Sequence, residues 1–212
     1  MSIKSLKRDL LKLYAFSFFI KAYSFLKICI LPLDELWKYL PEEGVFLDLG
    51  TGLGYIANFI ALGSAKRNVI GIDIDEKRIR AADNTIGERR NIQFICEDIR
   101  TTPIKDIDFA VMSDVLHHIP AEDHASVMRS LYNKMKSGGI FMIRETNKCK
   151  SLKYFIMNYP SEVLFYPFSE RGHFYNAGQL RALLESAGFS IAETIKSSPW
   201  FIYETIIYVC NK

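Results

Sequence analysis

The feature that most constrains the fold is a strand-length apolar segment followed directly by a glycine-rich turn and a helix, over residues 45–61. The turn places Gly50, Gly52 and Gly54 at alternate positions. Because glycine has no Cβ, such a turn can adopt positive φ and approach a ligand closely. The first N–H groups of the following helix have no helical partner and favour a negative group there. The segment therefore predicts an α/β protein that binds a ligand at this turn.

The spacing of the glycines distinguishes between classes of ligand. The dinucleotide fingerprint is G-x-G-x-x-G, whereas this turn reads G-x-G-x-G, with Tyr55 at the place of the third glycine. A second apolar segment ends in Asp73, where a carboxylate can accept both hydroxyls of a ribose. Asp48, just before the turn, can brace the loop or meet an ammonium group. The pattern accounts for an adenosyl ligand and requires no pyrophosphate.

Strands and helices alternate along most of the chain. Apolar segments predict strands at 45–49, 69–73, 92–96, 109–113 and 140–144. Helices are expected at 54–63, 76–86, 121–136 and 177–187, with Asp75 as an N-cap and Ser137–Gly139 closing the third. The final strands, 190–195 and 202–209, are expected to pair antiparallel. This alternation predicts a mostly parallel sheet with helices on both faces.

Composition and charge bound the class of protein. With 212 residues, 49% of them apolar and 24% charged, the chain suits one sizeable soluble core. Residues 1–31 carry six basic side chains and one acidic side chain, while the rest carries 21 basic and 23 acidic groups. The main body is therefore not a basic surface for nucleic acid. Four widely spaced cysteines suggest neither a disulfide framework nor zinc and fit a reducing cytoplasm, and we expect no metal.

Four motifs in order give the chain a family resemblance. Asp48–Gly54, Asp73, Cys96–Asp98 and Asp114–Ile119 together resemble the class I S-adenosylmethionine-dependent methyltransferases, over about residues 41–212. The resemblance implies a Rossmann-like three-layer α/β sandwich, with a mostly parallel seven-stranded sheet and an antiparallel last strand. It also implies S-adenosyl-L-methionine as cofactor, bound across the carboxyl ends of the strands. Thr51 is a mild departure, since many members have cysteine there.

The resemblance also implies roles for individual residues. The glycines would contact the methionine portion and the ribose, Asp73 would hold the ribose hydroxyls, and Asp98 with the Ile99 backbone would meet the adenine. The full set of expected cofactor residues is Asp48, Gly50, Thr51, Gly52, Gly54, Asp73, Ile74, Asp98, Ile99 and Asp114. Asp73 as a helix cap and Asp98 as a solvated loop acid are the structural alternatives.

Three side chains are candidates for proton transfer. His117 and His118 follow the fourth strand, and imidazole titrates near neutral pH, so either could remove a proton from an acceptor. Adjacent histidines seldom face one pocket, so one is expected to pack or cap, and His118 is slightly favoured as the base. Glu145 follows the fifth strand and is the third candidate; the alternatives are a partner for Arg144 or a cap.

The segment 147–175 is too long for an ordinary connection and is rich in aromatic residues. Its position favours a substrate pocket or lid over a hydrophobic cluster without a ligand. The expected substrate residues are Tyr154, Tyr159, His173 and Tyr175. For His173 an ordinary loop role is the stronger alternative.

The N-terminal arm, residues 1–40, is expected to precede the cofactor-binding domain at 41–212. Residues 2–31 predict one helix ending before Pro32, and 33–40 a second. The first helix is apolar on nearly all sides, which indicates burial against the domain or a second subunit, or else peripheral membrane contact. Its longest uncharged run, Leu13–Ile20, is too short to span a bilayer. We expect a cytoplasmic protein, with contact at the inner membrane face as the alternative.

These features predict an enzyme that methylates O, N or C of a small, apolar or lipid-like molecule. No nucleic-acid partner is expected. Two other functions stay open at this point: a nucleic-acid or protein methyltransferase that uses the basic arm as an anchor, and a cofactor-fold scaffold without catalysis. The acceptor, the atom methylated and the oligomeric state do not follow from the sequence, because one fold serves many acceptors.

Overall fold

The computed structural model describes residues 2–14, 18–147, 173–197 and 204–212. The chain forms two compact units, Met1–Val111 and Met112–Lys212. Seven strands follow the order β3-β2-β1-β4-β5-β7-β6, and β4 (Ile107–Ser113) contains the boundary between the units. The predicted fold class is confirmed: the sheet is mostly parallel, and β7 (Thr205–Asn211) runs antiparallel to both of its neighbours.

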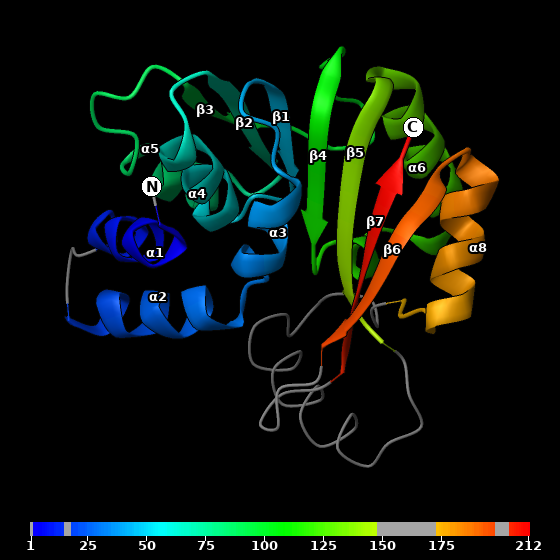
Figure 1. Cartoon of the computed structure of the whole chain (residues 1–212), viewed down its shortest axis with the longest axis horizontal. Helices are drawn as coiled ribbons and strands as arrows, with labels where there is room; N and C mark the ends of the chain where they lie inside the picture. The colour runs from blue at the N-terminus through cyan, green and yellow to red at the C-terminus, as the bar shows by residue number, and fades with distance from the viewer. Residues whose placement is uncertain (1, 15–17, 148–172, 198–203) are drawn as a thin grey trace. The chain divides into compact units, whose positions relative to one another are not determined.

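The first unit is built on three parallel strands. Its elements after residue 32 are α3 (Leu33–Tyr39), β1 (Gly44–Leu49), α4 (Tyr55–Gly63), β2 (Arg67–Asp73), α5 (Glu76–Asp83) and β3 (Ile92–Cys96). β1 pairs with β2 and β2 pairs with β3, all in parallel. Parallel strands are covered on both faces, and Phe46, Leu47 and Ile72 are accordingly inaccessible to solvent. Figure 1 shows α4 and α5 beside these strands.

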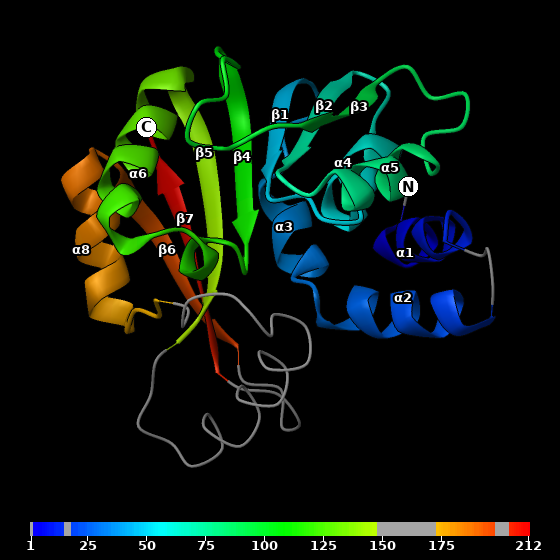
Figure 2. The ribbon, with the colours of Figure 1, turned by 180° about the vertical axis from the view of Figure 1, so that it is seen from behind.

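The second unit is built on antiparallel pairing. Its elements are η1 (Leu116–His118), η2 (Ala121–Asp123), α6 (His124–Lys134), β5 (Met135–Thr146), α8 (Ala177–Ala187), β6 (Ser190–Ser197) and β7. β7 lies between β5 and β6 and pairs antiparallel with both. Figure 2 shows α6 and α8 together beside these strands. Asn176 and Gln179 form a capping box at the start of α8, and Gly188, at φ 112°, ends that helix as expected.

The N-terminal arm differs from the single helix predicted over residues 2–31. It contains α1 (Ile3–Lys12) and α2 (Phe18–Ile30), and the chain turns at Leu13 and Tyr14. One helix of that length would extend about 45 Å, whereas the turn brings α2 alongside α1 (Figure 1). The turn is fixed because the Tyr14 side chain hydrogen-bonds to the Leu53 carbonyl, a tertiary contact that helical periodicity does not report.

The boundary between α6 and β5 also differs from the prediction. Ser137–Gly139 was expected to close the helix, but α6 ends at Lys134 and β5 begins at Met135. The reason is pairing with residue 212: Gly138 N donates to the Lys212 carbonyl, and Lys212 N donates to the Gly139 carbonyl.

α5 is shorter than predicted. It ends at Asp83, three residues before the predicted end, and Asp75 caps its start as expected.

Candidate functional site

The glycine turn in unit one is held against the end of β2. The N–H groups of Gly50 and Thr51 both donate to the Ile72 carbonyl, at 2.8 and 2.9 Å. Gly50, Gly52 and Gly54 all have positive φ, at 71°, 55° and 81°. Only glycine adopts this backbone without cost, which is why the turn uses it three times.

Two of these glycines have different surroundings. A Cβ on Gly54 would lie 2.6 Å from Phe94 Cζ and 3.2 Å from Ala82 Cβ, so Gly54 permits close packing within the unit. A Cβ on Gly52 would meet no atom within 4 Å. Gly52 therefore borders open space at the turn, and a ligand can approach its backbone.

Asp48 occupies the start of the helix that follows the turn. This carboxylate is buried, and its Oδ2 accepts hydrogen bonds from Thr51 Oγ1 at 2.6 Å and from Ala57 N at 3.1 Å. Ala57 N is one of the α4 N–H groups without a helical partner, and the helix dipole favours a negative charge there. Burial raises the pKa of Asp48 to about 6, and the nearby Asp73 carboxylate adds to the rise.

Asp73 faces the same turn. Its Oδ2 accepts from Gly52 N at 2.8 Å and its Oδ1 accepts from Asp75 N at 2.9 Å, while the residue is 6% exposed. A carboxylate has about four lone-pair sites, so it keeps acceptor capacity for ligand hydroxyls. Ile74, the next residue, is 71% exposed and offers an apolar surface at the same strand end. The open Gly52, the Asp73 carboxylate and the exposed Ile74 fit an adenosyl ligand.

Asp98, predicted to meet the adenine, has an internal partner. Its carboxylate pairs with the Arg100 guanidinium, with Arg100 Nη2 at 2.6 Å from Oδ2. The hydrogen bond from Arg100 lowers the pKa of Asp98, so the carboxylate is ionised at neutral pH. Ile99 is half-buried between them. Asp98 is therefore paired with Arg100 after the end of β3, and the contacts expected of Asp98 and Ile99 with the adenine stay predictions.

The N-terminal arm reaches the glycine turn through one side chain. Tyr14 OH donates to the carbonyl of Leu53, between the second and third glycines, at 2.8 Å. The same hydroxyl accepts from Asn58 Nδ2 at 2.9 Å, and the ring contacts that of Tyr55 in a tilted arrangement with centroids 4.2 Å apart. Burial raises the pKa of Tyr14, so the hydroxyl stays protonated and keeps its donor. The arm thereby fixes part of the turn.

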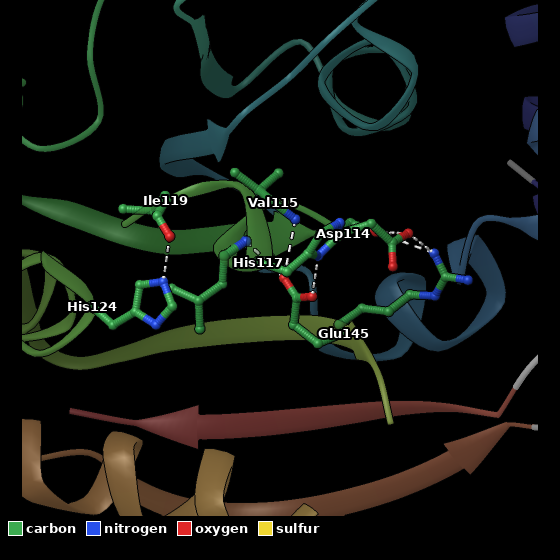
Figure 3. Close-up of polar contacts among 9 residues, drawn as sticks. Asp114, Val115, His117, Ile119, His124 and Glu145 are labelled. Atoms are coloured by element: carbon green, nitrogen blue, oxygen red, sulfur yellow. Dashed lines mark hydrogen bonds and ion pairs between the residues drawn. The ribbon is translucent and has the colours of Figure 1, made fainter. Parts of the chain in front are cut away.

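In unit two, Glu145 joins the end of β5 to the loop after β4 (Figure 3). Its Oε1 accepts from the N–H groups of Val115 and Leu116, at 3.0 and 2.7 Å. Its Oε2 lies 2.7 Å from His117 Nδ1, and both side chains are buried. With the Glu145 oxygen assigned as the acceptor of this contact, Nδ1 carries the proton and Nε2 is the acceptor nitrogen of the neutral ring. Glu145 therefore both caps η1 and orients His117.

The two adjacent histidines differ in environment. His117 is 9% exposed, its ring stacks on Phe174 at 4.6 Å, and its carbonyl accepts from His173 N at 3.1 Å. His118 is exposed, with its ring 4.0 Å from that of His117. The structure thus brings Glu145 together with His117, and His118 lies beside this pair at the surface.

Asp114 has a strained backbone and a charged partner. Its φ is 57°, which is rare for a residue other than glycine, and its N–H donates to the Arg144 carbonyl at 2.9 Å. Asp114 Oδ2 pairs with the Arg144 guanidinium. Among the residues that the structure describes, no partner reaches the buried Asp114 Oδ1. Strain and an unsatisfied oxygen together are typical of a residue held for function.

The substrate candidates divide between described and undescribed parts of the chain. Tyr154 and Tyr159 lie outside the described residues. Tyr175 OH is 2.8 Å from Nδ1 of the buried His124, whose Nε2 is 2.8 Å from the Ile119 carbonyl (Figure 3). Because a carbonyl only accepts, Nε2 donates and Nδ1 accepts from Tyr175. Burial lowers the pKa of His124, which agrees with a neutral ring.

His173 packs its ring 4.8 Å from Tyr175 and 5.7 Å from His124. His173 is exposed, and its role toward the substrate stays a prediction. Within the described ranges, no group of three or more His, Cys, Asp or Glu side chains could hold a metal ion.

The sequence did not identify three residues that shape the site. Tyr14 is one aromatic residue among many in the arm, and Asn58 lies on an otherwise apolar helix. Arg144 was considered only as a partner for Glu145, but alternation along a strand points neighbours to opposite sides. This alternation could have indicated from the sequence that Arg144 and Glu145 point to opposite faces of the sheet and do not pair with each other.

Comparison with known proteins places these features in context. A family described as a methyltransferase domain matches residues 22–194. A carboxy-S-adenosyl-L-methionine synthase of Shewanella denitrificans is 24% identical over 120 residues, covering 54% of this chain and 49% of that protein. A probable S-adenosylmethionine-dependent methyltransferase of Mycolicibacterium smegmatis is 28% identical over 154 residues, covering 70% and 53%. The chain spans about half the length of these curated relatives.

A solved structure shares the architecture. The crystal structure of a Pyrococcus horikoshii protein superimposes with a TM-score of 0.69 at 21% sequence identity. The match covers 88% of this chain and 91% of that one. At this identity the likeness concerns the fold, and it agrees with the α/β architecture described above.

Proposed function

The chain belongs to the methyltransferase-domain family, the class I enzymes that use S-adenosylmethionine, and on this premise we propose the reaction. The protein transfers a methyl group from S-adenosylmethionine to O, N or C of a small, apolar or lipid-like acceptor. The cofactor supplies an activated carbon, so the protein's task is to align donor and acceptor and to exclude water.

The observation that carries the proposal is the position of the Asp48 carboxylate. In dinucleotide-binding folds, the helix after the glycine turn receives a pyrophosphate. Here the chain's own carboxylate accepts the Ala57 N–H at that helix start. The two negatively charged phosphates of a dinucleotide would be repelled by this carboxylate. S-adenosylmethionine has no phosphate, and its sulfonium, ammonium and carboxylate groups give it a net positive charge. The turn therefore suits an adenosyl sulfonium better than a phosphate ligand.

In this proposal, each residue of the turn has a task. The open backbone at Gly52 receives the ligand, the Asp73 carboxylate accepts hydrogen bonds from the ribose hydroxyls, and the exposed Ile74 covers the adenine. Gly50, Gly54 and Thr51 hold the turn in shape, and Ile99 contributes its backbone. Asp114 offers its buried Oδ1 to the methionine ammonium.

We assign proton removal from the acceptor to His117. Glu145 fixes the ring through Nδ1, so Nε2 can accept the proton of a hydroxyl or amine. Glu145 is a positioning residue in this scheme, because its oxygens already bond to Val115, Leu116 and His117. His118, the slightly favoured base of the sequence analysis, is exposed beside this pair, and we assign the proton transfer to the buried His117, which Glu145 orients.

Charge and composition support a small apolar acceptor. Outside the arm the chain is slightly acidic, and the insertion at 147–175 is rich in aromatic residues. In the arm, Lys7 pairs with Asp34 at 2.7 Å and Lys12 pairs with Asp9 at 2.7 Å. These pairs reduce the positive charge that a nucleic-acid substrate would need.

The cofactor half of the proposal is tested with two matched aspartates. Asp73 and Asp75 both accept backbone N–H groups at the same strand end, but only Asp73 bonds to the glycine turn. In calorimetric titrations, Asp73→Asn should weaken S-adenosylmethionine binding by about tenfold or more, and Asp75→Asn should leave it unchanged. Equal affinities for the wild type and both variants would remove Asp73 from the site.

The acceptor half is tested by release of S-adenosylhomocysteine. The purified chain is incubated with S-adenosylmethionine and one pool of acceptors at a time. The pools are lipid extract, small aromatic alcohols and amines, RNA, and protein extract. The proposal predicts turnover with the lipid or small-molecule pools. Turnover confined to RNA or protein would establish the alternative class of substrate.

A further inference from the structure

The helix α2 exposes the side chains that a helix of a globular protein usually buries. Among the described residues, four of the five large apolar side chains that are exposed lie on it. They are Ile20 at 44%, Tyr23 at 42%, Phe25 at 55% and Leu26 at 60% exposure. Such a cluster on one surface marks an interaction site, whereas single exposed apolar residues are normal.

The buried side of α2 is comparatively polar. Ser24 is inaccessible to solvent, and its hydroxyl lies 2.8 Å from Tyr55 OH on α4. Ile28, one turn later, is also buried. The helix is therefore anchored to unit one through the face that contains Ser24 and Ile28. Its apolar side chains point outward because this anchor fixes its rotation.

Three of the four exposed apolar residues, together with Ala22, form a continuous sector with positive borders, and Ile20 lies just outside it, beyond Lys27. At about 100° per residue, Phe25, Ala22, Leu26 and Tyr23 span roughly 160° of the helix surface. Lys21 and Lys27 lie at the two edges of this sector, nearest the domain, and both are exposed. Lys27 Nζ lies 5.8 Å from the centre of the Tyr23 ring. The helix contains no acidic residue.

We propose that this outward face of α2 docks on an anionic lipid bilayer. The apolar sector would enter the boundary between headgroups and acyl chains, while the two lysines at its edges reach back to the headgroups. Lys7 and Lys12 are paired with Asp34 and Asp9, and the four other basic residues of segment 1–31 add long-range attraction. The helix lies in the interface and does not cross it, since none of the helices in the described ranges is long and apolar enough to span a membrane.

A second copy of the chain is the main competitor for this face, and charge argues against it. A twofold interface brings the same surface of both copies together. Lys21 and Lys27 of each copy would then face the other copy, and α2 has no acid to pair with them. Anionic headgroups supply the missing negative charge. The docking is independent of the proposed reaction, because it requires neither cofactor nor turnover.

The test is vesicle co-sedimentation of the full chain with a matched pair of variants. Ala22 lies in the apolar sector of α2 and Ala182 on α8, and both are exposed helical alanines. Ala22→Glu should lower partitioning onto vesicles of phosphatidylglycerol and phosphatidylcholine by about fivefold or more, because it places an anion against anionic lipid. Ala182→Glu should bind like the wild type.

A second variant tests the charges. The double variant Lys21→Gln/Lys27→Gln should partition less onto anionic vesicles, by about fivefold for each lysine removed. Its binding to vesicles of pure phosphatidylcholine should change little. Circular dichroism melting checks that all variants are folded, and light scattering reports their oligomeric state. Absence of wild-type partitioning would overturn the proposal, as would equal partitioning of the two alanine variants. A dimer that Ala22→Glu converts to monomer, without vesicle binding, would assign the face to a second copy.

Discussion

At the scale of single residues, Asp48 is a buried carboxylate whose charge changes with pH near neutrality. Its pKa is raised from the ordinary 3.8 to about 6, chiefly by burial. A group whose folded pKa lies above its unfolded pKa binds more protons in the native state between those two values. The stability that this group contributes is therefore present in acid and is lost as pH rises through about 6.

This sign leads to a prediction for Asp48→Asn. Thr51 and Ala57 both donate to a single oxygen of Asp48, so the amide oxygen of asparagine can replace it. The wild type should lose about 2–3 kcal/mol of unfolding free energy between roughly pH 4 and 7 relative to the variant. Urea titrations across this range measure the difference. Parallel pH profiles for the two proteins would show that Asp48 does not titrate in this range.

The glycines of the turn offer a second prediction because their surroundings differ. Gly54→Ala should destabilise the protein by several kcal/mol, since the new Cβ would overlap Phe94 at a positive φ. Gly52→Ala meets no atom and should cost only about 1–2 kcal/mol of backbone strain. The new methyl group would nevertheless enter the ligand's space. Thermal unfolding and cofactor titration of both variants separate the two effects, and undiminished cofactor affinity in Gly52→Ala would place the ligand elsewhere.

At the scale of elements, the arm acts on the turn through Tyr14. Removal of its hydroxyl in Tyr14→Phe leaves the Leu53 carbonyl without this donor and should cost about 1–3 kcal/mol of stability. Because Leu53 lies between two of the glycines, cofactor affinity should fall as well, with the maximal rate less affected. Tyr23→Phe, on the exposed face of α2, is the control and should change neither quantity. A purely structural role for Tyr14 would lower stability and leave the cofactor affinity intact.

The turn η1 and the end of β5 carry the proposed base, His117, and its partner Glu145. His117→Gln should lower the maximal rate by about 10²–10⁴, whereas His118→Gln should lower it by much less. Glu145→Gln should also reduce the rate and shift its pH dependence, because an amide no longer fixes the His117 tautomer. The pH profile of the rate with the best acceptor is the measurement. Equal losses for both histidine variants would contradict the assignment of His117 as the base.

The elements also show what a sequence can and cannot predict. The strand, turn and helix at 45–61 depend on local patterns, and β1, the positive-φ glycines and α4 appear where expected. The start of β5 was missed because it depends on pairing with Lys212. The turn at Tyr14 was missed because its cause is a contact with Leu53, 39 residues away.

In the candidate site too, features that depend on local sequence could be predicted, and contacts between distant residues could not. The acidic and glycine positions could be predicted because they lie at the ends of predicted strands. Their partners could not: Asp98 with Arg100, Asp114 with Arg144, and Glu145 with His117 depend on side-chain direction. The choice between the two adjacent histidines required coordinates. Neighbouring side chains of the η1 turn point in different directions, and the sequence does not show which ring faces Glu145.

At the scale of the whole molecule, the chain contains a glycine turn open to a ligand, a histidine oriented by a carboxylate and a helix with an exposed apolar face. The family is established by the match over residues 22–194, and the α/β fold agrees with it. An apolar acceptor and a membrane-docking helix are compatible, because an enzyme at a lipid surface can collect acceptors dissolved there. Each of the two can be tested without the other.

The central claim is that the turn after β1 binds an adenosyl sulfonium and not a paired-phosphate nucleotide. Calorimetric titration of the full chain with S-adenosylmethionine, and separately with NAD, tests it most directly. We predict saturable binding of S-adenosylmethionine that S-adenosylhomocysteine displaces, and no binding of NAD. Binding of NAD at the same concentrations, with none of S-adenosylmethionine, would contradict the account.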